Sequence, residues 1–182
     1  IEWRENLVVV SKNDALMLLD ISNPLPAQWS ARRLVNGLGV VSYSSGRQMV
    51  NFADDLVIFT QDGLFLLSQL TSHDFTPFSR PVKDEIDDFL AYNGASTPVS
   101  SIQDVILEIH NFQLYVMRWD IAYSLRYDFL NRRWSKDELT LASGVSIPAT
   151  IGANTIFWAA GKVVSTGLFD LIKVATGTTD AT

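Results

Sequence analysis

Apolar residues in this chain gather in short runs that are separated by polar turns. The first two runs, Leu7–Val10 and Ala15–Leu19, lie on either side of Lys12-Asn13-Asp14. Short apolar runs that are rich in branched residues and bounded by turn-forming clusters are typical of β-strands. The pattern therefore predicts an antiparallel hairpin near the start of the chain.

A second hairpin carries the strongest local signal. Its strands are predicted at Leu56–Thr60 and Leu64–Leu70, with Gln61-Asp62-Gly63 between them. Asp-Gly between two apolar runs favours a tight turn, because glycine adopts a positive φ without a steric cost.

Four hairpins are predicted in this way, and their spacing indicates a repeat. Their first strands begin at Leu7, Leu56, Phe112 and Thr155. Their turns are expected at Asn13, Gly63, Asp120 and Gly161. The separation of about 50 residues is close to the length of one β-propeller blade. We expect an all-β fold of antiparallel hairpins arranged as β-propeller-type blades, with a β-sandwich or barrel as the alternative.

One segment breaks the strand pattern. Between Arg80 and Tyr92 the apolar residues fall on one helical face, namely Val82, Ile86, Phe89 and Leu90. Pro81 and the acidic pair Asp84-Glu85 suit a first helical turn. We predict one short helix over about 82–92, within a single all-β, propeller-like domain that spans residues 1–175. A flexible polar tail is expected at 176–182.

Composition and charge narrow the possible classes. The chain has 182 residues, 47% of them hydrophobic, and a net charge of −6. Nucleic-acid readers usually carry a basic stripe, and none is visible here. The absence of cysteine excludes a disulfide framework and a thiolate metal site. No apolar run reaches the ~18 residues of a transmembrane helix, so we expect no membrane segment.

Candidate catalytic residues are few. Asp84, Glu85, Asp87 and Asp88 crowd together, and glycosidases place two carboxylates beside one bond. Acids at a helix start, however, commonly face solvent and complement the helix dipole. The two histidines, His73 and His110, lack a partner at metal-ligand spacing. We therefore expect no enzyme, no catalytic residue, no metal and no cofactor.

A strand-end aspartate followed by a turn and a tryptophan occurs twice. Asp20 precedes Trp29, and Asp128 precedes Trp134. Aspartate at such a place accepts backbone N–H groups in an Asx turn. We expect Asp20 and Asp128 to hold turns, and Trp29 and Trp134 to be largely buried against neighbouring strands. With Gly63, these are the predicted structural turn and anchor residues.

The central segment resembles a known family. From Glu85 to Trp134 the order is "EIDDFLAY", a polar loop, "DVILEIHNFQLYVMRWDIAYSLRYD" and then "RRW". This order resembles the late blades of the tail nozzle (tail hub) proteins of short-tailed bacteriophages, the packaged-DNA stabilisation family. "ADDLVIFTQDGLFLLSQL" is similar to their blade hairpins, and "IFWAAGKVVSTGLFDL" to the segment that follows their tryptophan.

The likeness covers Met49 to Leu171. Nozzle proteins are much longer than 182 residues, and this chain starts without methionine in a strand-like segment. We therefore expect a processed product or a piece of a longer protein.

The resemblance implies a structural role in the virion. It implies a homo-oligomeric ring, hexameric, that assembles in the host cytoplasm beside other tail and adaptor proteins. Such a ring forms the DNA channel, retains packaged DNA and passes it during ejection, without catalysis. In this reading each tryptophan covers the gap between two blades. An acidic wall suits DNA that passes without sequence-specific binding, because a basic wall would hold phosphates through counterion release.

Two other functions stay open at this point. A β-rich binding module could recognise carbohydrate or a protein partner through Trp3, Trp119 and Trp158. A hydrolase could use the carboxylates between Asp84 and Asp88.

Overall fold

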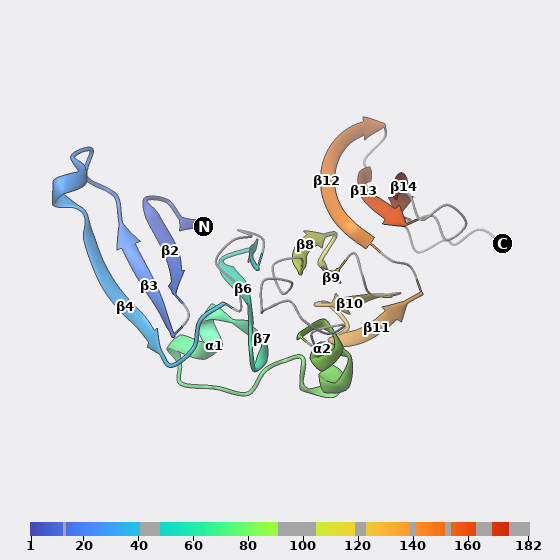
Figure 1. The fold of residues 1–182 in the computed structure, drawn as a ribbon. Coiled ribbons are helices and arrows are strands. Elements are labelled where there is room, and N and C mark those ends of the chain that lie inside the picture. The colour runs from blue at the N-terminus through green and yellow to red at the C-terminus, as the bar shows by residue number, and fades with distance from the viewer. Residues whose placement is uncertain are drawn as a thin grey trace. The chain divides into compact units, whose positions relative to one another are not determined.

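The chain folds into β-sheets that are built from consecutive strands. The computed structural model describes residues 1–12, 14–40, 48–90, 105–118, 123–138, 141–151, 154–162 and 169–174. Contacts divide the chain into two compact units, Ile1–Gln103 and Asp104–Thr182, whereas the sequence predicted one domain over 1–175. Within these ranges, each unit holds two antiparallel sheets whose strands follow chain order (Figure 1). The predicted all-β class is confirmed, while the predicted tail at 176–182 lies outside the described residues.

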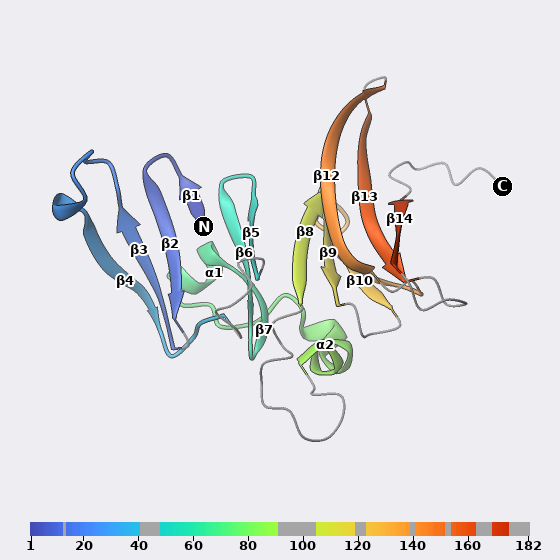
Figure 2. The ribbon, with the colours of Figure 1, turned by 45° about the horizontal axis from the view of Figure 1, so that its top comes forward.

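The first sheet contains the first predicted hairpin. Its strands, in order across the sheet, are β1 (Glu2–Arg4), β2 (Leu7–Lys12), β3 (Ala15–Asp20) and β4 (Ser30–Asn36) (Figure 2). β2 and β3 pair from Leu7 with Asp20 to Lys12 with Ala15. Both strands are therefore confirmed, although Asn13 itself lies outside the described residues. The strand-like start of the chain forms β1. The sequence did not predict β4, which a 3₁₀ turn at Pro26–Gln28 precedes.

The second sheet contains the Asp-Gly hairpin. Its strands are β5 (Met49–Phe52), β6 (Asp55–Thr60) and β7 (Gly63–Leu66). Thr60 pairs with Gly63, and the φ of Gly63 is 123°, so the predicted turn is confirmed.

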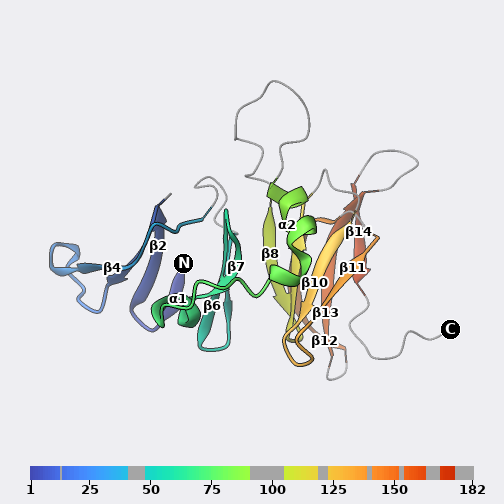
Figure 3. The ribbon, with the colours of Figure 1, turned by 90° about the horizontal axis from the view of Figure 1, so that it is seen from below.

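The predicted return strand to Leu70 is wrong beyond Leu66. The chain continues as a short helix, α1 (Leu67–Thr71), which contacts β6 and β7 (Figure 3). Side chains around the helix start bind the backbone there: Oδ1 of Asp55 accepts the N–H of Ser68 at 3.1 Å, and Oε1 of Gln69 accepts the N–H of Leu66 at 2.9 Å. These two hydrogen bonds satisfy the backbone N–H groups of Leu66 and Ser68, which a continued strand would have to pair with a neighbouring strand.

The predicted helix is confirmed as α2 (Lys83–Leu90). A 3₁₀ turn at Arg80–Val82 leads into it. Ile86 and Phe89 are buried, as the helical spacing required, and the acidic residues Asp84, Asp87 and Asp88 are exposed.

The second unit contains the third and fourth sheets. The third consists of β8 (Ile106–His110), β9 (Gln113–Met117), β10 (Ser124–Asp128) and β11 (Arg133–Asp137). The fourth consists of β12 (Leu141–Ile151), β13 (Asn154–Lys162) and β14 (Phe169–Val174). β12 contacts β8 and β9, which joins the two sheets. The predicted hairpin of β9 and β10 is confirmed as a strand pair, and its expected turn at Asp120 lies outside the described residues.

The predicted turn at Gly161-Lys162 is wrong. Both residues belong to β13, where Gly161 is paired with Leu141 on one side and Asp170 on the other. Pairing on both sides outweighs the turn preference of glycine, which depends only on local backbone freedom.

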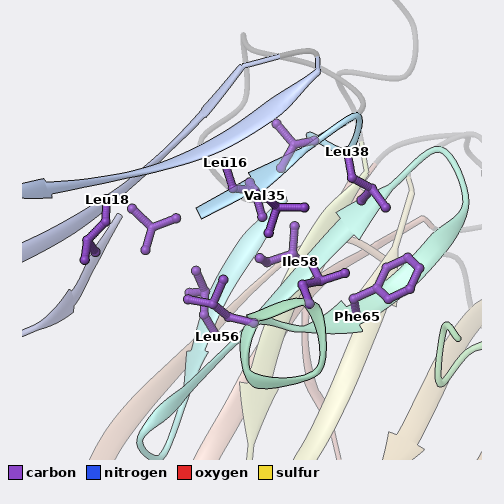
Figure 4. Close-up of a cluster of buried hydrophobic side chains, with 11 residues drawn as sticks. Leu16, Leu18, Val35, Leu38, Leu56, Ile58 and Phe65 are labelled. Atoms are coloured by element: carbon purple, nitrogen blue, oxygen red, sulfur yellow. The ribbon is translucent and has the colours of Figure 1, made fainter. Parts of the chain in front are cut away.

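An apolar layer between the first and second sheets holds the first unit together. The first sheet contributes Leu16, Leu18 and Val35, and β6 contributes Leu56 and Ile58 (Figure 4). None of these five side chains is more than 5% exposed. The remaining members of this layer are Val9, Leu38, Val40, Phe65, Leu67 and Leu70. At roughly 1.5–3 kcal/mol for each fully buried side chain, the layer outweighs any single hydrogen bond of the unit.

The segment before α2 lies along the edge of β7, and Gly63 makes room for it. The N–H of Phe78 donates to the carbonyl of Leu64, and the N–H of Leu64 donates to Oγ of Ser79, both at 3.0 Å. A Cβ atom at Gly63 would lie 2.5 Å from Oγ of Ser79 and 3.1 Å from Cβ of Pro77. Gly63 therefore serves two needs, the positive φ and the close approach of this segment.

We predict that Gly63→Ala destabilises the first unit more than Gly37→Ala does. Gly37 also has a positive φ, 76°, but no atom lies within 4 Å of a Cβ built there. Gly37→Ala should cost about 1–2 kcal/mol of unfolding free energy for backbone strain. Gly63→Ala should cost about 1–3 kcal/mol more, because it also crowds Ser79 and Pro77. Urea denaturation of both variants measures the difference, and equal losses would contradict this packing.

Candidate functional site

The two strand-end aspartates hold turns in the same way. Oδ1 of Asp20 accepts the N–H of Ser22 at 2.9 Å. Oδ1 of Asp128 accepts the N–H of Leu130 at 2.8 Å and of Asn131 at 3.1 Å, and its Oδ2 accepts Nδ2 of Asn131 at 2.7 Å. Both are the Asx turns that the sequence predicted.

These hydrogen bonds also shift the ionisation of both carboxyl groups. The backbone N–H of Ser22, followed by its side chain, lowers the pKa of Asp20 below its ordinary value. The side chain of Asn131, followed by its backbone N–H, lowers the pKa of Asp128. Hydrogen bonds to a carboxylate favour its charged form, which explains the direction of both shifts.

The two tryptophans do not repeat one another. Trp134 is half-buried and pairs across the strands with Tyr127; the ring centroids lie 4.9 Å apart. It is therefore anchored within its own sheet. Trp29 is 41% exposed, and its Nε1 donates to the carbonyl of Asn23 at 2.8 Å.

The prediction that Trp29 is largely buried against neighbouring strands is therefore wrong. Trp29 closes its own turn, because a hydrogen bond to a carbonyl six residues earlier is available there. In the repeated sequence pattern, the two aspartates therefore have the same structural role, because both hold Asx turns. The two tryptophans have different roles.

A cleft of about 360 Å³ lies beside the Gly63 turn in the first unit. Its apolar wall includes Phe75, Pro77 and Ile86, and its charged rim includes Asp62, Arg80, Lys83 and Asp87. Phe75 is 52% exposed. An apolar surface with a charged rim can bind a small amphipathic ligand.

The acidic cluster considered for a hydrolase meets this cleft at one residue, Asp87. Its carboxylate forms an ion pair with Lys83 one helical turn away. Hydrogen bonding to Asp87, then its charge, raises the pKa of Lys83. Lys83 and Asp87 thus place one cation and one anion at the rim of the cleft. A glycosidase instead places two carboxylates on either side of the glycosidic bond.

The two histidines belong to different units of the chain. His110 is buried in β8. His73 is exposed, and its ring lies edge to face with that of Phe75, with the ring centroids 6.4 Å apart. Among the described residues, no group of three His, Cys, Asp or Glu side chains could hold a metal ion.

A junction that the sequence did not reveal joins β1 to the turn between β5 and β6. Nε1 of Trp3 and the guanidinium of Arg4 both donate to the carbonyl of Asp54, at 3.2 and 3.3 Å. The Arg4 guanidinium also stacks over the Trp3 ring, 4.3 Å from its centroid. Nδ2 of Asn51 donates to the carbonyl of Glu2 at 2.8 Å. Trp3, considered above as a surface aromatic, instead ties the first sheet to the second across some fifty positions of sequence, and no local pattern signals such a contact.

We compared the chain with models of protein families and with curated protein sequences. No protein-family model matches this chain, and no curated protein sequence matches it. Within the described ranges, no helix is long and apolar enough to cross a membrane.

We predict that the Asx turns contribute to stability in a pH-dependent way. The pKa values of Asp20 and Asp128 lie below 3.8 in the folded chain, so the folded state binds their protons less tightly than the unfolded state does. Their contribution is complete above pH 3.8 and is lost as the pH falls through the folded pKa values. An NMR titration of the carboxyl carbons should place both pKa values below 3.8.

The matched variant is Asp128→Asn, which keeps an oxygen acceptor but cannot ionise. It should retain the turn while the stability of the second unit becomes less dependent on acid pH. An Asp128 carboxyl that titrates at or above 3.8 would contradict the assignment.

Proposed function

We propose that this chain is part of a structural protein of a bacteriophage tail, a nozzle or hub that lines the DNA channel. The observation that supports the proposal best is the series of antiparallel sheets, each made of consecutive strands. Blades of β-propellers are meander sheets of this kind, and each blade covers a face of the next.

The packing of the first unit suits blades of a propeller. The first and second sheets share one apolar layer, and the second sheet is buried on both of its faces at β6. Leu56 and Ile58 point into the shared layer, while Val57 and Phe59, on the opposite face, are also 0% exposed. A strand that is buried on both faces has a covering layer on each side, as the strands of an internal blade do. We propose that the sheets of both units are propeller-type blades.

The charge of the chain suits the proposed channel. A net charge of −6 gives a wall that repels phosphates, so a duplex could slide past it without being held. We propose that several copies form a closed ring with other tail and adaptor proteins, and that the ring retains packaged DNA until ejection. Closed cyclic symmetry is the usual result when one contact repeats between identical subunits.

The cleft beside Gly63 favours a second candidate function. Phe75 offers an exposed ring, and Asp62, Arg80 and Asp87 offer charged groups around it. Sugars combine an apolar face with hydroxyl groups, so a carbohydrate-binding module is the alternative to the tail protein.

Imaging of particles tests the first proposal. Phage particles assembled with the chain, without it, and with the gene restored in trans should be compared by negative-stain microscopy and by DNA content. We expect particles without the chain to lose a ring of density at the tail and to release their DNA. Particles that keep both in the absence of the chain would overturn the proposal. A monomer that binds a glycan array, and loses binding on Phe75→Ala, would favour the binding module instead.

A further inference from the structure

The face of the first sheet that points away from the second sheet is largely apolar; we call it the outer face. Strand register identifies its residues, because directly paired residues of antiparallel strands share a face. One row consists of Glu2, Val8, Leu19 and Ala31, and the next of Val10, Met17 and Arg33. A third row, at the far end of the face, consists of Lys12, Ala15 and Asn36, and its two polar residues are exposed. Val10 is 40% exposed, Ala31 is exposed, and Val8, Met17 and Leu19 are partly buried. The apolar residues form one continuous patch across β2, β3 and β4.

The strand sequences indicate that this patch belongs in an interface. An antiparallel strand with one solvated face alternates apolar and polar residues, whereas a strand covered on both faces is apolar throughout. β6 reads Leu-Val-Ile-Phe from Leu56 and is buried on both faces. β2 reads Leu-Val-Val-Val from Leu7, yet only its inner face, at Val9, is fully buried. Because β2 is as continuously apolar as β6, we expect the outer face of the first sheet to be covered by another layer, as both faces of β6 are.

The charges at the two edges of the patch indicate what that layer is. Glu2 lies at the β1 edge and Arg33 at the β4 edge, and both are exposed. The patch therefore carries an acid at one side and a base at the other. A two-fold axis that runs along the strands would lay β1 of one copy over the β4 edge of the other. Such an axis sets each row against the same row of the second copy, so Glu2 would lie opposite Ala31 of that copy. Arg33 of the second copy would lie one row away, about 7 Å along the strand, an offset that its long side chain can span.

We propose that the outer face of the first sheet binds the same face of a second copy of this chain. Sheets that pack face to face with nearly aligned strands lie ~10 Å apart, a distance that the side chains of the patch can fill. An isologous contact uses one self-complementary patch twice, as the Glu2 and Arg33 edges allow. The inference rests only on the geometry of the first sheet and does not depend on the proposed tail function.

Charge reversal tests the contact by sedimentation velocity over a range of concentrations. The wild-type chain should form dimers. Glu2→Arg alone and Arg33→Glu alone should each weaken dimerisation by about tenfold, because each change places two like-charge contacts in the dimer. The double variant Glu2→Arg/Arg33→Glu should restore the dimer, since it exchanges the two charges.

Arg32→Glu is the matched control. Arg32 neighbours Arg33 on β4 but pairs with Leu18, so it lies on the inner face. The same charge change there should leave dimerisation unaltered. A chain that stays monomeric at all concentrations would overturn the proposal. So would a dimer that Arg33→Glu does not weaken, or that Arg32→Glu weakens equally.

A second measurement avoids charged substitutions altogether. Because the chain has no cysteine, Val10→Cys introduces a single thiol in the patch, and Phe75→Cys introduces one beside the cleft. Alkylation of the thiol at position 10 should slow as the chain dimerises, while that at position 75 should not. Equal rates at every concentration would overturn the proposal even if the charged variants failed to fold.

Discussion

Burial of both faces of β6 is the constraint on which the first unit depends. Four successive apolar residues cannot be shielded by one neighbouring layer, because alternate side chains of a strand point in opposite directions. Leu56 and Ile58 are therefore covered by the first sheet, and Val57 and Phe59 by other parts of the chain. The turn at Gly63 and the capping of α1 by Asp55 and Gln69 hold the ends of this hairpin. The Trp3 and Arg4 hydrogen bonds to the carbonyl of Asp54 add a polar tie at the end that Asp55 and α1 share, opposite the Gly63 turn.

The sequence predicted those elements whose cause is local. Apolar runs located β2, β3, β6 and β9, helical spacing located α2, and strand-end aspartates located two Asx turns. Gly63 was predicted from the dipeptide that it completes, and its positive φ confirms the reason.

Elements that depend on distant partners were missed or misread. Gly161 suggests a turn until strands on both sides pair with it. Trp29 was predicted to be a core residue from its large apolar ring. In the structure its indole N–H instead donates to the carbonyl of Asn23. The contact of Trp3 with Asp54 depends on how two sheets pack, and no pattern within either segment encodes it. The cleft beside Gly63 was missed for the same reason, since its wall is assembled from a turn, a connecting segment and a helix.

Native-state hydrogen exchange tests the shared apolar layer most directly. If the first and second sheets depend on this layer, the slowest amides of β3 and β6 should exchange through one common opening, with the same free energy and the same dependence on denaturant. Leu16→Ala in β3 should then lower the protection of β6 as much as that of β3, by about 2–5 kcal/mol. Amides of β3 that open independently, with β6 unchanged in the Leu16→Ala variant, would contradict the account.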